Sequence, residues 1–250
     1  MGKIVAIGGG ENGRPGTNYE TGAFDREIVA MAGGEHPRFL FIGLANVYAE
    51  GYYNVMRNIY HGMYGCATAH LTADDVKDPQ AASSKIANAD IIYVGGGNTL
   101  RLMTLLRRHR VDEMLAAAYE NNTVLCGVSA GAICWCDFGN SDSRKFTSGS
   151  DRLIRVKGLG FIHVLLCPHF DAEIKRQADL PRMMKTTYRI PAIALENGAA
   201  LVVNDDQFKI MTSIEGARAR KCHWKNGEYV AQVMQDGIFE DLKYLYEISS

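Results

Sequence analysis

Short apolar runs alternate with longer amphipathic segments along the first half of the chain. The short runs carry few polar positions and predict strands, and the longer segments repeat their apolar residues with a helical period. The predicted strands are residues 3–7, 38–45, 67–71, 90–97 and 123–129, and the predicted helices are residues 24–34, 52–65, 77–89, 99–122 (with a break near Val111) and a segment beginning at Ala130. Apolar strands that alternate with helices predict a parallel sheet covered on both faces.

The second half of the chain has a different pattern. Its predicted elements are strands at residues 163–168 and 192–196, hairpins at residues 201–211 and 223–233 with turns at Asn204–Asp205 and Asn226–Gly227, and a terminal helix at residues 239–248. No internal repeat, low-complexity segment or linker interrupts the chain. We therefore expect one domain over residues 1–250, with a doubly wound, mostly parallel α/β sheet, C-terminal β-hairpins and a terminal helix.

Composition and charge narrow the class of protein. The chain has 250 residues, of which 47% are hydrophobic, and a formal net charge of −1 with no basic block. This charge gives no basis for a nucleic-acid partner or an acidic membrane surface. No run approaches the length of a membrane span, and the apolar run near Met1 is too short for a signal peptide. We therefore expect a soluble, cytoplasmic protein.

The cysteines give no sign of a metal site. They are scattered, several lie in apolar runs, and no CxxC pair or Cys/His spacing suggests zinc. The six are Cys66, Cys126, Cys134, Cys136, Cys167 and Cys222. We expect reduced, mostly buried thiols, and neither a metal nor a cofactor.

The stretch LCGVSAGAICW (Leu125–Trp135) places a serine between glycines where a predicted strand becomes a predicted helix. Its pattern Gly127-x-Ser129-x-Gly131 matches the nucleophile elbow, a sharp turn that aims the serine hydroxyl outward. The next N–H, that of Ala130, starts a helix and is free to bind an oxyanion. An ordinary tight turn is the alternative, but ligands of open α/β sheets bind at strand carboxyl ends. We therefore expect Ser129 to be a nucleophile.

A nucleophilic serine needs a base, and the base needs an orienting group. Among the seven histidines, His169 is best placed, because it follows the apolar run VLLCP at the end of a predicted strand. Glu196 closes the apolar run AIALE at another strand end and is the candidate orienting acid. Asp142 and Asp171 are the alternatives.

Two glycine clusters follow predicted strands. Gly95–Gly97, followed by Asn98, opens a helix, and its N–H groups suit a second oxyanion donor, for which Gly97 is the candidate. Residues 8–13 (GGGENG) fit a GxGxxG pattern, but the loop-like sequence RPGTNYETG follows. The next strand also ends in glycine rather than in the acid that binds ribose. A dinucleotide site is therefore not expected.

Four features together resemble the peptidase E group, the S51 serine peptidases. They are GGGNT after a strand, G-x-SAGA, PHF, and a strand that ends in an acid. The resemblance runs from about Lys3 to about Val203. It implies the class I glutamine amidotransferase-like fold of a group that includes aspartyl dipeptidases and cyanophycinases. Amidotransferases of this fold carry cysteine at the elbow, so the serine argues against glutaminase chemistry. The tail beyond Met211 exceeds a typical dipeptidase and is expected to form an extension from about residue 212.

The resemblance also implies roles for single residues. Ser129 would be the nucleophile and His169 the general base, with the N–H groups of Gly97 and Ala130 as oxyanion donors. The third triad member would be Glu196 or its neighbour, with Asp142 as the nearest match to an acid that follows the elbow.

Substrate recognition is implied in the same way. The dipeptidases use an arginine beyond the histidine to pair with a substrate aspartate, and Arg182 is its nearest counterpart, with Arg176 as the rival. Bidentate carboxylate binding explains why arginine suits that role. Asn98, in GGGNT, is the other candidate substrate-binding residue.

The expected activity is hydrolysis of short peptides after an N-terminal aspartate, through a Ser-His-Glu triad and an acyl-enzyme. The alternatives are a cyanophycinase-like peptidase acting on Asp-linked substrates and a non-catalytic binding protein that retains the elbow. The expected partner is a small peptide. A homodimer is a further possibility, because Trp224, Tyr244 and Tyr246 offer aromatic surface, although the same residues would also suit a local core.

Overall fold

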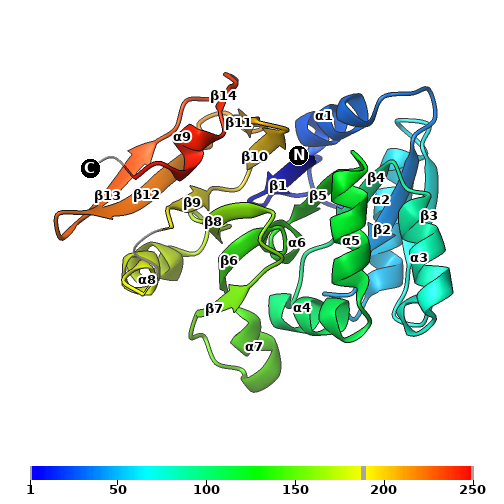
Figure 1. Ribbon diagram of the computed structural model, residues 1–250, viewed down its shortest axis with the longest axis horizontal. Helices are drawn as coiled ribbons and strands as arrows, with labels where there is room; N and C mark the ends of the chain where they lie inside the picture. Colours follow the sequence, from blue (N-terminus) through cyan, green and yellow to red (C-terminus); the bar gives the residue numbers. More distant parts are fainter. Residues whose placement is uncertain (1, 187–189, 249–250) are drawn as a thin grey trace.

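A computed structural model describes residues 2–186 and 190–248 (Figure 1). The described residues form a mixed α/β structure with two β-sheets, one of eight strands and one of six. Most helices lie around the first sheet. The second sheet lies beside it, and its hairpin of β12 (Ala219–Lys225) and β13 (Glu228–Val233) extends away from the rest (Figure 1). Among the described helices, none is long and apolar enough to cross a membrane.

The eight-stranded sheet has the order β14-β11-β10-β1-β5-β4-β2-β3. Its last five strands in that order are mutually parallel, and the other three are antiparallel additions at one edge. The strands are β1 (Lys3–Ile7), β2 (Arg38–Ile42), β3 (Ala67–Leu71), β4 (Ile91–Val94), β5 (Val124–Val128), β10 (Ala199–Asn204), β11 (Gln207–Thr212) and β14 (Glu240–Asp241). Each parallel strand lies within the range predicted for it, which confirms the parallel sheet of the first half.

Helices cover both faces of the parallel strands. On one face, α1 (Gly22–Ala32) and α2 (Ala49–Tyr60) bury aromatic and aliphatic side chains in a cluster with Val5 and Ile7. Ile4 and Ala6 point to the opposite face, as strand alternation requires, and pack in a second cluster. The helices of that face are α3 (Pro79–Ala87), α4 (Thr99–Arg108), α5 (Val111–Glu120) and α6 (Ala130–Ile133). The boundary between α4 and α5 confirms the predicted break near Val111.

The six-stranded sheet has the order β13-β12-β9-β8-β6-β7. Its other strands are β6 (Cys136–Ser141), β7 (Ile154–Lys157), β8 (Ile162–Cys167) and β9 (Ala192–Leu195). The strands predicted at residues 163–168 and 192–196 are β8 and β9, and they lie in this second sheet instead of extending the first. The reason is that α6 ends after four residues and the chain enters β6, which pairs in parallel with β8.

Several later elements differ from the prediction. The strands β6 and β7 and the helices α7 (Ser143–Ser148) and α8 (Ile174–Met184) were not predicted, and α8 contains a proline that weakens its helical pattern. The terminal helix is limited to α9 (Lys243–Tyr246). The turn at Asn226–Gly227 is confirmed, with positive φ at both residues. The other hairpin turns one residue later than predicted, because Asn204 pairs with Gln207.

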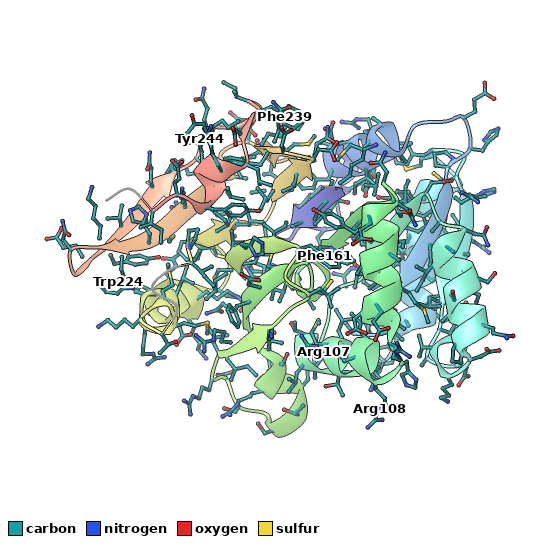
Figure 2. All side chains as sticks on the ribbon, viewed as in Figure 1. Arg107, Arg108, Phe161, Trp224, Phe239 and Tyr244 are labelled. Atoms are coloured by element: carbon teal, nitrogen blue, oxygen red, sulfur yellow. The ribbon has the colours of Figure 1, made fainter. Side chains whose placement is uncertain are left out.

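The C-terminal aromatic residues lie on separate segments. Figure 2 shows Phe239 and Tyr244 near β14 and α9, and Trp224 on β12. Tyr244 is 48% exposed, whereas the Trp224 indole donates to the carbonyl of Pro181 at 3.1 Å and so packs against α8. The tryptophan therefore belongs to local packing, and the homodimer stays a prediction.

Candidate active site

Ser129 lies at the carboxyl end of β5, between this strand and α6, as predicted. Its backbone has φ 56° and ψ −111°, a sparsely populated conformation that costs about 1–3 kcal/mol for a non-glycine residue. A β-carbon at Gly131 would lie 1.9 Å from the carbonyl oxygen of Val94 in β4, and one at Gly127 would lie 2.6 Å from that oxygen. Both glycines of the motif are therefore needed for the turn to pack against β4.

His169 follows β8 and pairs with an amide side chain. Its Nδ1 lies 2.7 Å from Oδ1 of Asn197, which follows β9. An amide oxygen only accepts hydrogen bonds, so Nδ1 carries the proton and Nε2 keeps its lone pair. The N–H of Asn197 in turn donates to Asp171 at 2.8 Å, which anchors the loop that carries the amide. This arrangement orients the ring as a general base requires.

The end of β1 supports the whole site. The carbonyl oxygens of the three successive residues 7–9 each accept a hydrogen bond from the backbone N–H of a different segment of the site. The pairs are Ser129 N to Ile7 O (3.0 Å), His169 N to Gly8 O (3.2 Å) and Gly198 N to Gly9 O (2.9 Å). A β-carbon at Gly9 would lie 2.1 Å from Asn197 Oδ1 and 2.4 Å from His169 Nδ1. The first glycine cluster is thus a support for the site, a role that its sequence pattern did not predict.

Gly9→Ala should therefore separate His169 from Asn197. We expect the kcat of peptide hydrolysis to fall by about 100-fold, because small displacements of a catalytic group cost that much. We also expect the low-field proton NMR signal of the Nδ1–H to disappear. Gly16→Ala is the control for backbone strain away from the site, since its φ of 86° disfavours alanine but a β-carbon there meets nothing within 4 Å. Wild-type kcat together with an unchanged NMR signal in Gly9→Ala would contradict this positioning role.

The second glycine cluster also lies beside Ser129, as predicted. A β-carbon at Gly96 would be 3.6 Å from the Ser129 β-carbon, and the backbone of Gly96 hydrogen-bonds the Tyr52 hydroxyl. Within residues 2–186 and 190–248, the N–H groups of Gly97 and Ala130 have no acceptor. Ala130 is the first residue of α6, whose N–H no helical bond can satisfy. Two free donors thus flank the serine.

Glu196 does not pair with His169. One carboxylate oxygen accepts from Arg220 Nη1 at 2.5 Å, and the other accepts the N–H of Arg218 at 2.9 Å. Glu196 and Asn197 extend the end of β9, where successive side chains point to opposite sides. Since Asn197 faces the histidine, Glu196 faces away from it. The structure thus corrects the expected pairing of His169 with Glu196 and puts the neighbouring amide there.

The two candidate arginines are bound elsewhere. Arg182, on α8, pairs with Asp179, and its side chain is 78% exposed. Arg176 is buried, with Nη1 3.0 Å from Oδ1 of Asn140 in β6. Both guanidinium groups thus support α8 and its contact with the second sheet, and the structure does not bring either of them beside Ser129.

Two other candidates also have local roles. Asn98 caps α4, because its Oδ1 accepts the N–H of Arg101 at 3.1 Å. One bond leaves the other lone pair of Oδ1 and the two N–H donors of the amide, and the expected contact between Asn98 and substrate stays a prediction. Asp142 precedes α7 and lines a separate pocket with Lys145 and Lys175. It is not the partner of His169.

The cysteines offer no competing nucleophile. All six are buried and unpaired with one another, as predicted. Burial raises the pKa of the Cys126 and Cys134 thiols well above the ordinary value, and a protonated thiol is a poor nucleophile. In the described part of the chain, no three His, Cys, Asp or Glu side chains are grouped to hold a metal ion.

Comparison with known proteins identifies the family. Residues 4–211 match the model of peptidase family S51. The chain belongs to this family. It is 33% identical over 223 residues to the uncharacterized peptidase YgaJ of Bacillus subtilis (strain 168), which covers 88% of this chain and 91% of that protein. It is 25% identical over 196 residues to peptidase E of Shewanella denitrificans (strain OS217), covering 72% and 76% of the two chains. The S51 resemblance predicted from the motifs is confirmed, and the chain is a peptidase by family.

Solved structures share the fold of this S51 peptidase. A peptidase from an acI-B1 Actinobacterium aligns with a TM-score of 0.71 at 18% identity, covering 96% of this chain and 97% of that one. A putative peptidase E from Listeria monocytogenes EGD-e aligns with a TM-score of 0.63 at 16% identity, covering 85% and 98%. The mixed α/β fold of this S51 peptidase therefore resembles that of peptidase E.

Proposed function

We propose that this S51 peptidase is a serine-type enzyme that cleaves short peptides through an acyl-enzyme. The observation that carries the proposal is the 2.7 Å contact between His169 Nδ1 and Asn197 Oδ1. The backbone N–H of His169 binds the carbonyl of Gly8, and that of Ser129 binds the carbonyl of the preceding residue. A strained serine, an oriented imidazole and two free N–H donors are the groups that acyl transfer needs. The triad we propose is therefore Ser129, His169 and Asn197.

In the proposed reaction, Ser129 Oγ attacks the scissile carbonyl while His169 Nε2 takes its proton. Asn197 holds the ring in the tautomer that accepts at Nε2. The N–H groups of Gly97 and Ala130 donate to the oxyanion, and loss of one such donor costs about 100- to 1,000-fold in rate. His169 then gives its proton to the leaving amine. Water deprotonated by the same nitrogen hydrolyses the acyl-enzyme and releases the second product.

The preference for an N-terminal aspartate is not part of this proposal. The two arginines expected to supply it have other partners, because Arg182 pairs with Asp179 and Arg176 binds Asn140 in β6. Short peptides remain the proposed substrate class because family membership supports peptidase activity. The side chain that the site selects has to be inferred from the residues around Ser129.

A fluorophosphonate probe tests the serine chemistry without assuming a substrate. We expect one probe per chain, attached to Ser129 through a new P–O bond as fluoride leaves, with the site located by peptide mass spectrometry. Labelling should be lost in Ser129→Ala and strongly slowed in His169→Ala, because the hydroxyl then lacks its base. Folded wild-type protein that takes up no probe would favour the non-catalytic binding protein.

A further inference from the structure

A pocket of about 510 Å³ opens beside Ser129. Gly96, Gly97 and Val128 form part of its wall, so it adjoins the proposed oxyanion donors and the residue that precedes the serine. Pockets of this size accommodate whole side chains of a ligand, and such sites combine apolar walls with a few polar groups.

The position of the pocket indicates which part of a substrate would enter it. Neither His169 nor Asn197 lines it. Because His169 gives its proton to the leaving amine, the amine departs on the histidine side of Ser129. The acyl residue, whose carbonyl oxygen points at Gly97, stays on the pocket side. Its side chain is therefore the group that the pocket would receive.

Four aromatic side chains line the pocket, among glycines and a few polar groups. Tyr52 and Tyr93 lie in the wall, together with Val55. At the mouth, Tyr48 is 80% exposed and Phe146 is 60% exposed, although they come from different segments, the loop before α2 and helix α7. Large exposed apolar side chains that converge on one opening are typical of a binding site.

The charges around the pocket cancel. Arg14 is the arginine that lines it, and its Nη2 lies 2.9 and 2.8 Å from the two carboxylate oxygens of Glu11, which also lines it. Behind the wall, Asp25 is fully buried and accepts from Thr21 and two tyrosine hydroxyls at 2.8–2.9 Å. Burial raises the pKa of the Asp25 carboxyl and so favours its uncharged form. An acidic side chain in the pocket would thus meet a guanidinium whose charge Glu11 already balances.

We propose that this pocket binds the side chain of the acyl residue and selects a large apolar or aromatic side chain over aspartate. The inference rests on the proposed serine chemistry and names its substrate class: short peptides that begin with a residue such as phenylalanine or leucine.

Aminoalkyl diphenyl phosphonates with phenylalanine, alanine and aspartate side chains test the preference. Each reacts by forming a bond from Ser129 Oγ to phosphorus, while phenol leaves with the serine proton. We expect the phenylalanine analogue to inactivate about 10- to 100-fold faster than the other two, from the apolar area that it buries. A faster aspartate analogue would overturn the inference and leave the serine chemistry intact. Fluorophosphonate labelling without reaction of any analogue would also overturn it, whereas no labelling by any probe would refute the proposed function itself.

Gly51→Phe tests the location of the preference. Gly51 lines the pocket from α2, and a β-carbon there meets nothing within 4 Å. A benzyl group at this position should fill the pocket and slow the phenylalanine analogue by about 10-fold or more, with the alanine analogue unchanged. The matched control is Asn54→Phe, which adds the same group to an exposed position of α2 outside the pocket. If Gly51→Phe melts like wild type and slows both analogues equally, or neither, the inference is wrong.

Discussion

Alanine at Ser129, at His169 or at both positions should lower the kcat of peptide hydrolysis by the same factor, about 10⁶-fold. The nucleophile and its base act as one unit, because the hydroxyl attacks only as the imidazole takes its proton, and the imidazole has no other group to activate. The N–H groups of both residues bind adjacent carbonyls at the end of β1. Truncating either side chain therefore leaves the backbone contacts in place. The measurement is kcat for the three purified variants on a peptide that the wild type cleaves.

A buried cysteine provides the control for this comparison. Cys126→Ala changes a side chain three residues before the serine in β5, where the thiol donates to a carbonyl of the neighbouring strand. It should leave kcat at the wild-type value, because that thiol is fully buried and does not line the pocket. If the losses of the two single variants multiply in the double variant, Ser129 and His169 act separately and the proposed mechanism is wrong.

The parallel half of the fold could be predicted from the sequence because its strands, apart from the edge strand β3, are buried on both faces. In KIVAI every residue after the lysine is apolar, and a buried strand has no polar side to obscure the pattern. The second sheet was harder to predict. Its β6 has the sequence CDFGNS, in which glycine and polar residues predominate, and such residues are more frequent in turns than in strands. Because β8 pairs with β6, the second sheet could not be predicted without recognising β6 as a strand.

The candidate site shows the same limit at the scale of single residues. Ser129 and His169 could be predicted because each lies at the carboxyl end of an apolar strand, where ligands of α/β sheets bind. Their strands belong to different sheets, and the carbonyls at the end of β1 hold the two residues next to each other. The third residue could not be predicted in that way. Glu196 and Asn197 are adjacent at the end of β9, and the choice between them depends on which side of the strand faces β1. The pairing of Glu196 with Arg218 and Arg220 settles that orientation, and those arginines lie in a segment far along the chain.

Replacing the amide at position 197 should cause the second large loss of kcat. Asn197→Ala removes the oxygen that accepts the Nδ1–H of His169, so the ring loses its preferred tautomer and its orientation. Loss of the orienting residue in comparable triads costs about 10⁴-fold in kcat, and we expect a loss of about 10³- to 10⁴-fold here. The bond from the Asn197 N–H to Asp171 involves the backbone and survives the substitution, so the loop should keep its place. The measurement is kcat, with thermal unfolding to confirm the fold.

Two companion variants decide which neighbour orients the histidine and how. Asn197→Asp restores the acceptor and adds a negative charge that stabilises the imidazolium. It should keep most of the activity at neutral pH and move the acid limb of the kcat/KM profile to higher pH by about one pH unit. Glu196→Gln breaks the ion pair with Arg220 on the opposite side of the strand and should leave kcat unchanged. A large loss in Glu196→Gln together with a small one in Asn197→Ala would return the role to the glutamate. An acid limb that stays in place in Asn197→Asp would show that the residue at position 197 does not contact the base during catalysis.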